Sequence, residues 1–231
     1  MHGWVRCDRA VAVRERLSAL ELDVRRLPGH GRRPNAPHQD WHPRSATHTW
    51  PLGPGMTLGK HYDSRLYRFP LVGLIRLPVS AVALGIAQGA IDAAMEIFQS
   101  KAAIVGKGPL SDQSVVQARI AEAVALVSSG RAWLHAAVQE AWDATTRGSV
   151  SLRVRAELLL AALNATCRAA EAVQSVYTMA GGSANYRRSS LQRSLRGVHA
   201  VTQHVGVALQ QWEEAGRMLL GVKPLQPLLL L

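Results

Sequence analysis

The sequence predicts an all-α protein, an antiparallel four-helix bundle preceded by a poorly structured N-terminal segment. Apolar residues recur at helical spacing through most of residues 62–221, and no stretch in that region alternates apolar and polar residues as strands do. The connections between the apolar stretches are short and carry Gly, Pro or Ser. Helical stretches of about thirty residues with short connections favour an antiparallel bundle.

The N-terminal segment, residues 1–61, has a different composition from the rest of the chain. It is dense in Arg, Pro and Gly, and only residues 9–26 carry a loose apolar stripe that predicts a short helix. Four of its histidines, at positions 30, 38, 42 and 48, show no metal-ligand spacing on a regular element, so no metal site is predicted. We expect disorder here. A second interpretation, translation from a shifted reading frame, stays open.

The first helix of the bundle follows from residue 63 and has small residues spaced by four along one side. These are Ala81, Gly85, Gly89 and Ala93. Four-residue spacing places them on one face, so we expect another helix to approach closely there. Pro78 is expected near the start of this helix, where its missing N–H matters least.

Three more helices are expected over residues 113–147, 151–180 and 191–220, each with an apolar stripe at helical spacing. Ser111 or Asp112 is the expected cap of the second helix. Residues 222–231 form an apolar tail that we expect to dock on a partner subunit rather than on a membrane.

Composition excludes several classes of protein. The formal net charge is +11, but the arginines are spread over both halves and aromatic residues make up 5% of the chain, so nucleic-acid binding is not predicted. Cys7 and Cys167 form neither a disulfide framework nor a zinc site, which fits the cytoplasm. Charged and polar residues interrupt the apolar stretch 71–94, so we predict no membrane-spanning segment.

A glycine turn followed by a basic segment is the first candidate site. Gly181, Gly182 and Ser183 end the third predicted helix in the manner of a glycine C-cap. Arginines crowd the segment after it, at positions 187, 188, 193 and 196. Backbone donors and guanidinium groups together suit a phosphate or diphosphate, and a solvated basic face is the alternative.

His204 is the second candidate. On a continuous fourth helix it shares one side with Gly197, Ala200 and Ala208, whose small side chains leave a flat space for either a planar ring or a neighbouring helix. His199 lies roughly 140° around that helix from His204, so the two do not chelate one metal. A second side of the helix carries Arg196, His199 and Gln203.

Four stretches carry a family resemblance. YDSRLYRFPLVGL, AVALGIAQGAID, VYTMAGGSANYRRSSLQRSLRGVHAVTQHV and AGRMLLG together resemble the C-terminal helical domain of the acyl-CoA dehydrogenase superfamily, over about residues 62–221. Within it they resemble the flavin-dependent monooxygenase branch, whose oxygenase components hydroxylate aromatic or polycyclic substrates. The resemblance implies a flavin, FMN or FAD, supplied in reduced form by a separate flavin reductase. It also implies self-association as a homotetramer, or assembly with a full-length paralogue.

The resemblance also implies roles for single residues. The dehydrogenase branch places a Glu base nine residues after an Arg that matches Arg196; that position is Val205 here, and a valine cannot abstract a proton. The monooxygenase branch places a histidine one residue earlier, facing the flavin, and His204 stands there. Its implied role is to donate a hydrogen bond to, or exchange a proton with, the flavin or the substrate hydroxyl. Gly181, Gly182, Ser183 and Gln192 are implied to line the flavin of a neighbouring subunit, with His199 and Gln203 nearby.

Two departures from the family pattern shape the prediction. The Asp that follows the matched arginine in the family is Gly197 here, and the family's two preceding domains have no counterpart in residues 1–61. We therefore expect a truncated or remnant oxygenase subunit, with His204 as its catalytic residue. A non-catalytic oligomerising bundle and an acyl-CoA dehydrogenase-type oxidoreductase are the alternatives.

Overall fold

The structure is a computed structural model that describes residues 65–102 and 108–226. In this part of the chain every regular element is a helix, so the all-α prediction is confirmed for it. The predicted N-terminal segment 1–61, with its short helix and Cys7, lies outside the described residues. So does the end of the apolar tail, residues 227–231.

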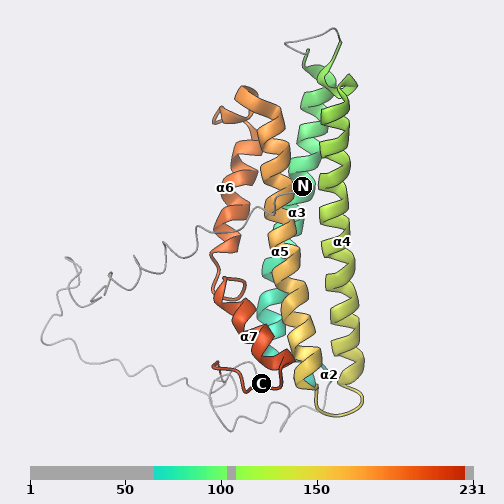
Figure 1. Cartoon of the computed structure of the whole chain (residues 1–231), viewed down its shortest axis with the longest axis vertical. Coiled ribbons are helices and arrows are strands. Elements are labelled where there is room, and N and C mark those ends of the chain that lie inside the picture. The colour runs from blue at the N-terminus through green and yellow to red at the C-terminus, as the bar shows by residue number, and fades with distance from the viewer. Residues whose placement is uncertain (1–64, 103–107, 227–231) are drawn as a thin grey trace, which may run out of the picture. The chain divides into compact units, whose positions relative to one another are not determined.

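Three long helices lie side by side and form the body of the bundle (Figure 1). α5 is the central one, since it packs against both of the others and against the last two helices of the chain. The bounds of the helices are α2 Arg65–Arg68, α3 Leu71–Ser100, α4 Ser114–Ala144, α5 Leu152–Ala180, α6 Ser190–Thr202 and α7 Gln210–Leu219, with short 3-10 helices η2 Leu110–Asp112 and η3 Gly181–Asn185.

The fourth helix is broken, where the sequence predicted one helix over residues 191–220. α6 ends at Thr202 and α7 begins at Gln210. Between them the backbone forms turns whose hydrogen bonds join residues three apart. His204 N–H donates to the Val201 carbonyl at 3.0 Å, and Val207 N–H donates to the His204 carbonyl at 2.9 Å. The apolar periodicity continues on both sides of the break, which is why the sequence pattern did not reveal it.

Two smaller expectations about helix starts were also wrong. α3 begins at Leu71, so Pro78 lies inside the helix, beyond its first turn. Ser111 and Asp112 lie in η2 instead of capping α4, whose N-cap is Gln113 without a side-chain bond.

Of the four small residues predicted to meet another helix, Ala93 is partly buried against the core. At Ala81, Gly85 and Gly89 no helix within the described residues makes the predicted close contact. All three are exposed, and a Cβ added at either glycine would meet no heavy atom within 4 Å. The close approaches lie elsewhere. A Cβ on Gly73 would stand 2.7 Å from Leu158 Cδ2, and one on Gly130 would stand 3.3 Å from Ala165 Cα. Small residues therefore permit contact of α5 with α3 and α4, while Gly85 and Gly89 of α3 face outward.

The core lies between α3, α4 and α5 and is built mainly from small and branched apolar residues. One buried polar link crosses it: Ser80 Oγ donates to the Ala162 carbonyl at 2.9 Å, and Thr166 Oγ1 donates to Ser80 Oγ at 3.2 Å. α3 is long and apolar enough to cross a membrane by length and composition, but a core helix meets the same criterion. Its inner residues, such as Ile91, are completely buried in this bundle.

Candidate functional site

The glycine turn ends α5 as predicted. Gly181 is the C-cap, with φ +59° and its N–H bonded to the Thr178 carbonyl. Gly181 and Gly182 are exposed, with open space where a Cβ would stand, and Ser183 is half-buried. The hydroxyl of Tyr177 donates to Asn185 Oδ1 at 2.6 Å and so ties the end of the turn back to α5. Gly181 and Gly182 therefore form an open surface before the N-terminal end of α6.

The outward side of α6 is polar and basic. Arg193, Arg196 and His199 are exposed, and Gln192 is half-buried. Within the described ranges neither arginine forms an ion pair. The placement of Arg196 and His199 on one side agrees with the sequence prediction, while Gln203 is the C-cap of α6. A phosphate group and a solvated basic face both remain compatible with this surface.

His204 lies beyond the end of α6, in the break between the two helices. The prediction that it shares a helical side with Gly197, Ala200 and Ala208 is therefore wrong. A Cβ on Gly197 would meet Ile86 Cδ1 at 3.5 Å, so a side chain of α3 covers that position. The imidazole of His204 is exposed, and its Nδ1 accepts the Gly206 backbone N–H at 3.0 Å. With Nδ1 as acceptor, the neutral ring carries its proton on Nε2.

A buried polar cluster lies between α3 and α7, next to the break, and the sequence pattern did not predict it. Arg76 on α3 is 5% exposed, and Gln211 and Glu214 on α7 are each 2% exposed. Arg76 Nη2 donates to Gln211 Oε1 at 2.6 Å, and Glu214 Oε2 accepts the Leu225 backbone N–H at 3.0 Å. The available signal was an arginine inside the otherwise apolar start of α3, since a buried guanidinium needs partners from another element.

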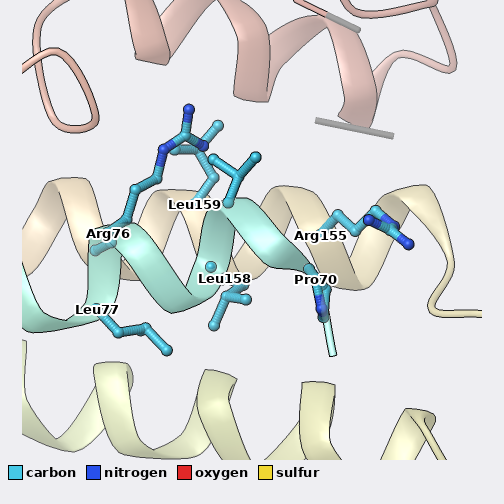
Figure 2. A pocket seen from close by; sticks show the side chains of 9 residues that line it. Pro70, Arg76, Leu77, Arg155, Leu158 and Leu159 are labelled. Carbon is cyan, nitrogen blue, oxygen red and sulfur yellow. The ribbon is translucent and has the colours of Figure 1, made fainter. Parts of the chain in front are cut away.

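Burial dominates the electrostatics of this cluster. Loss of hydration lowers the pKa of Arg76 to about 10, and the nearby Glu214 opposes that shift. Arg76 Nε has no hydrogen-bond partner in the described part of the chain. Arg76 also lines a small pocket between α3 and α5 with Arg155, but Figure 2 shows the two guanidinium groups lying apart and pointing in different directions. The pocket therefore does not present a paired arginine site.

The predicted site residues fall into two groups at opposite ends of α6. Gly181, Gly182 and Ser183 precede the helix, and His204 follows it. The thirteen residues of α6 make a helix roughly 20 Å long, so the glycine turn and His204 of one chain do not meet. Arg196 and His199 lie on the helix that connects the two groups.

The helical part of the chain matches a known protein family. The family model described as acyl-CoA dehydrogenase, C-terminal domain, matches residues 77–209. The chain belongs to this family. The match runs from residue 77, inside α3, to the end of the break after α6, so it contains both groups of predicted site residues.

Similar proteins of known activity lie in the monooxygenase branch. The chain is 29% identical to indole-3-acetate monooxygenase of Pseudomonas putida over 71% of its own length and 42% of that protein. It is 30% identical to the pigment production hydroxylase of Rhodococcus erythropolis, again over 71% of this chain and 42% of that protein. The chain thus spans less than half the length of these relatives.

A solved structure supports the same fold. XiaF from Streptomyces sp., in complex with FADH2 and glycerol, superposes with a TM-score of 0.66 at 15% identity, covering 71% of this chain and 42% of that one. The sequence-based resemblance to the monooxygenase branch is confirmed. The predicted flavin cofactor agrees with the FADH2 in this neighbour.

The residues present fit one wall of a flavin site. Gly181 and Gly182 leave open space where a Cβ would stand, and Arg193 and Arg196 offer exposed guanidinium groups for a phosphate. His204 offers a single outward N–H donor. Every one of these groups lies at the surface of the described part of the chain.

Proposed function

We propose that this chain supplies the C-terminal helical part of the oxygenase component of a flavin-dependent monooxygenase, which hydroxylates an aromatic or polycyclic substrate. The observation that carries the proposal is His204, an exposed imidazole held in one tautomer at a break in the fourth helix. The names of the relatives, indole-3-acetate monooxygenase and pigment production hydroxylase, support the reaction class. A separate reductase would supply the reduced flavin.

His204 is the proposed catalytic residue. A bound reduced flavin supplies the chemistry that activates O2. The Nε2–H of His204 donates a hydrogen bond to the substrate hydroxyl or exchanges a proton with it, a role that histidine side chains often fill in general acid–base catalysis. The neighbouring Val205 is 74% exposed and carries no ionisable group, so the alternative of acyl-CoA dehydrogenation by a base at that position is disfavoured.

Gly181, Gly182, Ser183, Gln192 and Arg196 are the proposed flavin-binding residues. The turn lies a helix length from His204, which suits contact with a flavin held by a neighbouring subunit of a self-associated assembly. Arg196 would neutralise phosphate charge from α6. His199 and Gln203 follow towards His204 and would lie next to the substrate.

The first test is a titration of the purified chain with FAD and with FMN, in oxidised and reduced form, followed by fluorescence. Hydroxylation is then assayed with a flavin reductase, NADH and O2, with indole-3-acetate as the first probe substrate. We expect His204→Ala to lower product formation at least about hundredfold, the lower range for loss of a proton-transfer group. His135→Ala, an exposed histidine on α4, is the matched control. Full activity of His204→Ala, or no flavin binding by the parent chain, would refute the proposal.

A second candidate function is a non-catalytic oligomerising module. The observation that favours it is the outer side of α3, where Ile75 and Val82 are more than half exposed beside the open glycines 85 and 89. Sedimentation equilibrium separates the candidates when it is combined with the flavin titration. A stable oligomer without flavin binding would support the module alone.

A further inference from the structure

The side chain of Gln211 joins the break to the first helix of the bundle. Its Oε1 accepts from Arg76 Nη2 at 2.6 Å, and its Nε2 donates to the Val205 carbonyl at 2.9 Å. Arginine can only donate and a carbonyl can only accept, so these two partners fix which way round the amide lies. A neutral amide serves both partners at once, through its oxygen and its nitrogen.

The same connection reaches His204 through the next residue. Gly206 follows Val205 directly, is buried, and donates its N–H to His204 Nδ1 at 3.0 Å. A Cβ on Gly206 would stand 3.0 Å from Arg76 Cγ and 3.1 Å from His204 Nδ1. The stem of Arg76 and the imidazole of His204 therefore pack on the same glycine.

Burial makes this connection stiff. Arg76 and Gln211 are almost completely removed from solvent, so losing either hydrogen bond would leave a buried polar group unsatisfied. Arg76 lies on α3, 135 positions before Gln211, so this hydrogen bond ties the break to a helix of the bundle body. His204 itself is exposed and lies between α6 and α7, outside both helices.

We propose that Arg76 and Gln211 are positioning residues for His204: through the Val205 carbonyl and the Gly206 N–H they hold the turn so that the imidazole presents its Nε2–H outward. The catalytic meaning of this arrangement rests on the proposed function. The arrangement itself is measured on the chain alone, without flavin or substrate.

The test is the tautomer of His204, read from long-range 1H–15N NMR spectra in alkaline buffer, where imidazole is neutral. His204→Asn identifies the signal. In the parent chain we expect a protonated Nε2 and an unprotonated Nδ1, together with slow exchange of the Gly206 amide proton. A parent chain with the proton on Nδ1 would overturn the inference before any other variant is made.

Two variants of Gln211 then separate folding from positioning. Gln211→Leu removes both hydrogen bonds. Gln211→Glu still accepts from Arg76, but it turns a carboxylate oxygen towards the Val205 carbonyl and has no N–H for it. In Gln211→Glu we expect a folded protein in which the two His204 nitrogen shifts move towards a common average and the Gly206 amide exchanges about tenfold faster.

Glu214→Gln is the matched control, because it alters the other buried polar residue of α7 and keeps an acceptor for Leu225. It should leave the His204 shifts unchanged. A folded Gln211→Glu with parent-like His204 shifts and Gly206 exchange would overturn the inference. If the parent chain shows the expected His204 tautomer but no hydroxylation in the assay above, the result counts against the proposed function and not against the positioning.

Discussion

The three long helices of the bundle body and the broken fourth helix are stabilised in different ways. α3, α4 and α5 pack through small apolar residues and glycines, with Ser80 and Thr166 as their buried polar link. α6 and α7 join the same body, but at their junction Arg76, Gln211 and Glu214 make directional buried bonds. Apolar packing sets the stability of the first region, whereas hydrogen-bond geometry sets the backbone path of the second.

This difference explains why an exposed histidine can hold a defined orientation. A continuous helix would fix His204 by its own backbone, but here the helix stops two residues earlier. The bonds of Gln211 and Gly206 replace that constraint. Substitutions in the body should therefore change the free energy of unfolding most. Substitutions of the buried polar residues next to the break should change local order, with a smaller loss of the free energy of unfolding.

The largest expected effect is a cavity in the body. Ile91 is completely buried between the long helices, so Ile91→Ala should lower the free energy of unfolding by about 2–5 kcal/mol. Urea denaturation followed by circular dichroism measures it. Ile75→Ala on the same helix is the control, since Ile75 is 53% exposed and should cost about 0.5 kcal/mol or less. Equal losses at the two positions would show that the outer side of α3 is covered.

The next effect is overpacking where α4 approaches α5. A Cβ on Gly130 would stand 3.3 Å from Ala165 Cα, which is backbone and cannot move aside, so Gly130→Val should cost about 1–3 kcal/mol. Gly216→Val on α7 carries the same change of residue where nothing lies within 4 Å. The difference between the two melting temperatures isolates the contact. Identical shifts would mean that helix propensity alone explains both.

A moderate effect is expected from the polar cluster. Glu214→Ala removes the acceptor of the Leu225 N–H and the carboxylate near Arg76, so we expect a loss of about 1–3 kcal/mol and faster proteolysis after residue 220. Glu213→Ala is the neighbouring control, because Glu213 is exposed. If both variants behave alike, the cluster contributes nothing specific.

The sequence predicted the long helices of the body closely. The expected helix over residues 151–180 is α5, Leu152–Ala180, and the one over 113–147 is α4, Ser114–Ala144. Apolar periodicity determines such elements, because one face of each is buried against the others. The glycine cap at Gly181 was predictable for a related reason: its positive φ is a local property that glycine favours.

The candidate site was predicted only in part, because tertiary bonds decide the rest. Arg196 and His199 share the outer side of α6, as their spacing indicates. The predicted neighbours of His204 were wrong, because α6 ends at Thr202 and a side-chain bond from Gln211, seven residues beyond His204, holds the Val205 carbonyl. No local pattern specifies that bond. The same holds for Arg76, whose partners come from the far end of the chain.

The smallest expected effect is a gain in stability. It tests the outer side of α3, where the sequence predicted a close contact with another helix. Gly89 lies inside α3 with open space beside it, so Gly89→Ala should raise the free energy of unfolding by about 0.5–1 kcal/mol through helix propensity alone. Thermal denaturation at two protein concentrations measures it. If the outer side of α3 packs on a second copy of the chain, the added methyl group would instead destabilise the protein and weaken self-association. A gain that does not depend on concentration would show that the close contacts of the small residues end at Gly73 and Gly130, inside the body of the bundle.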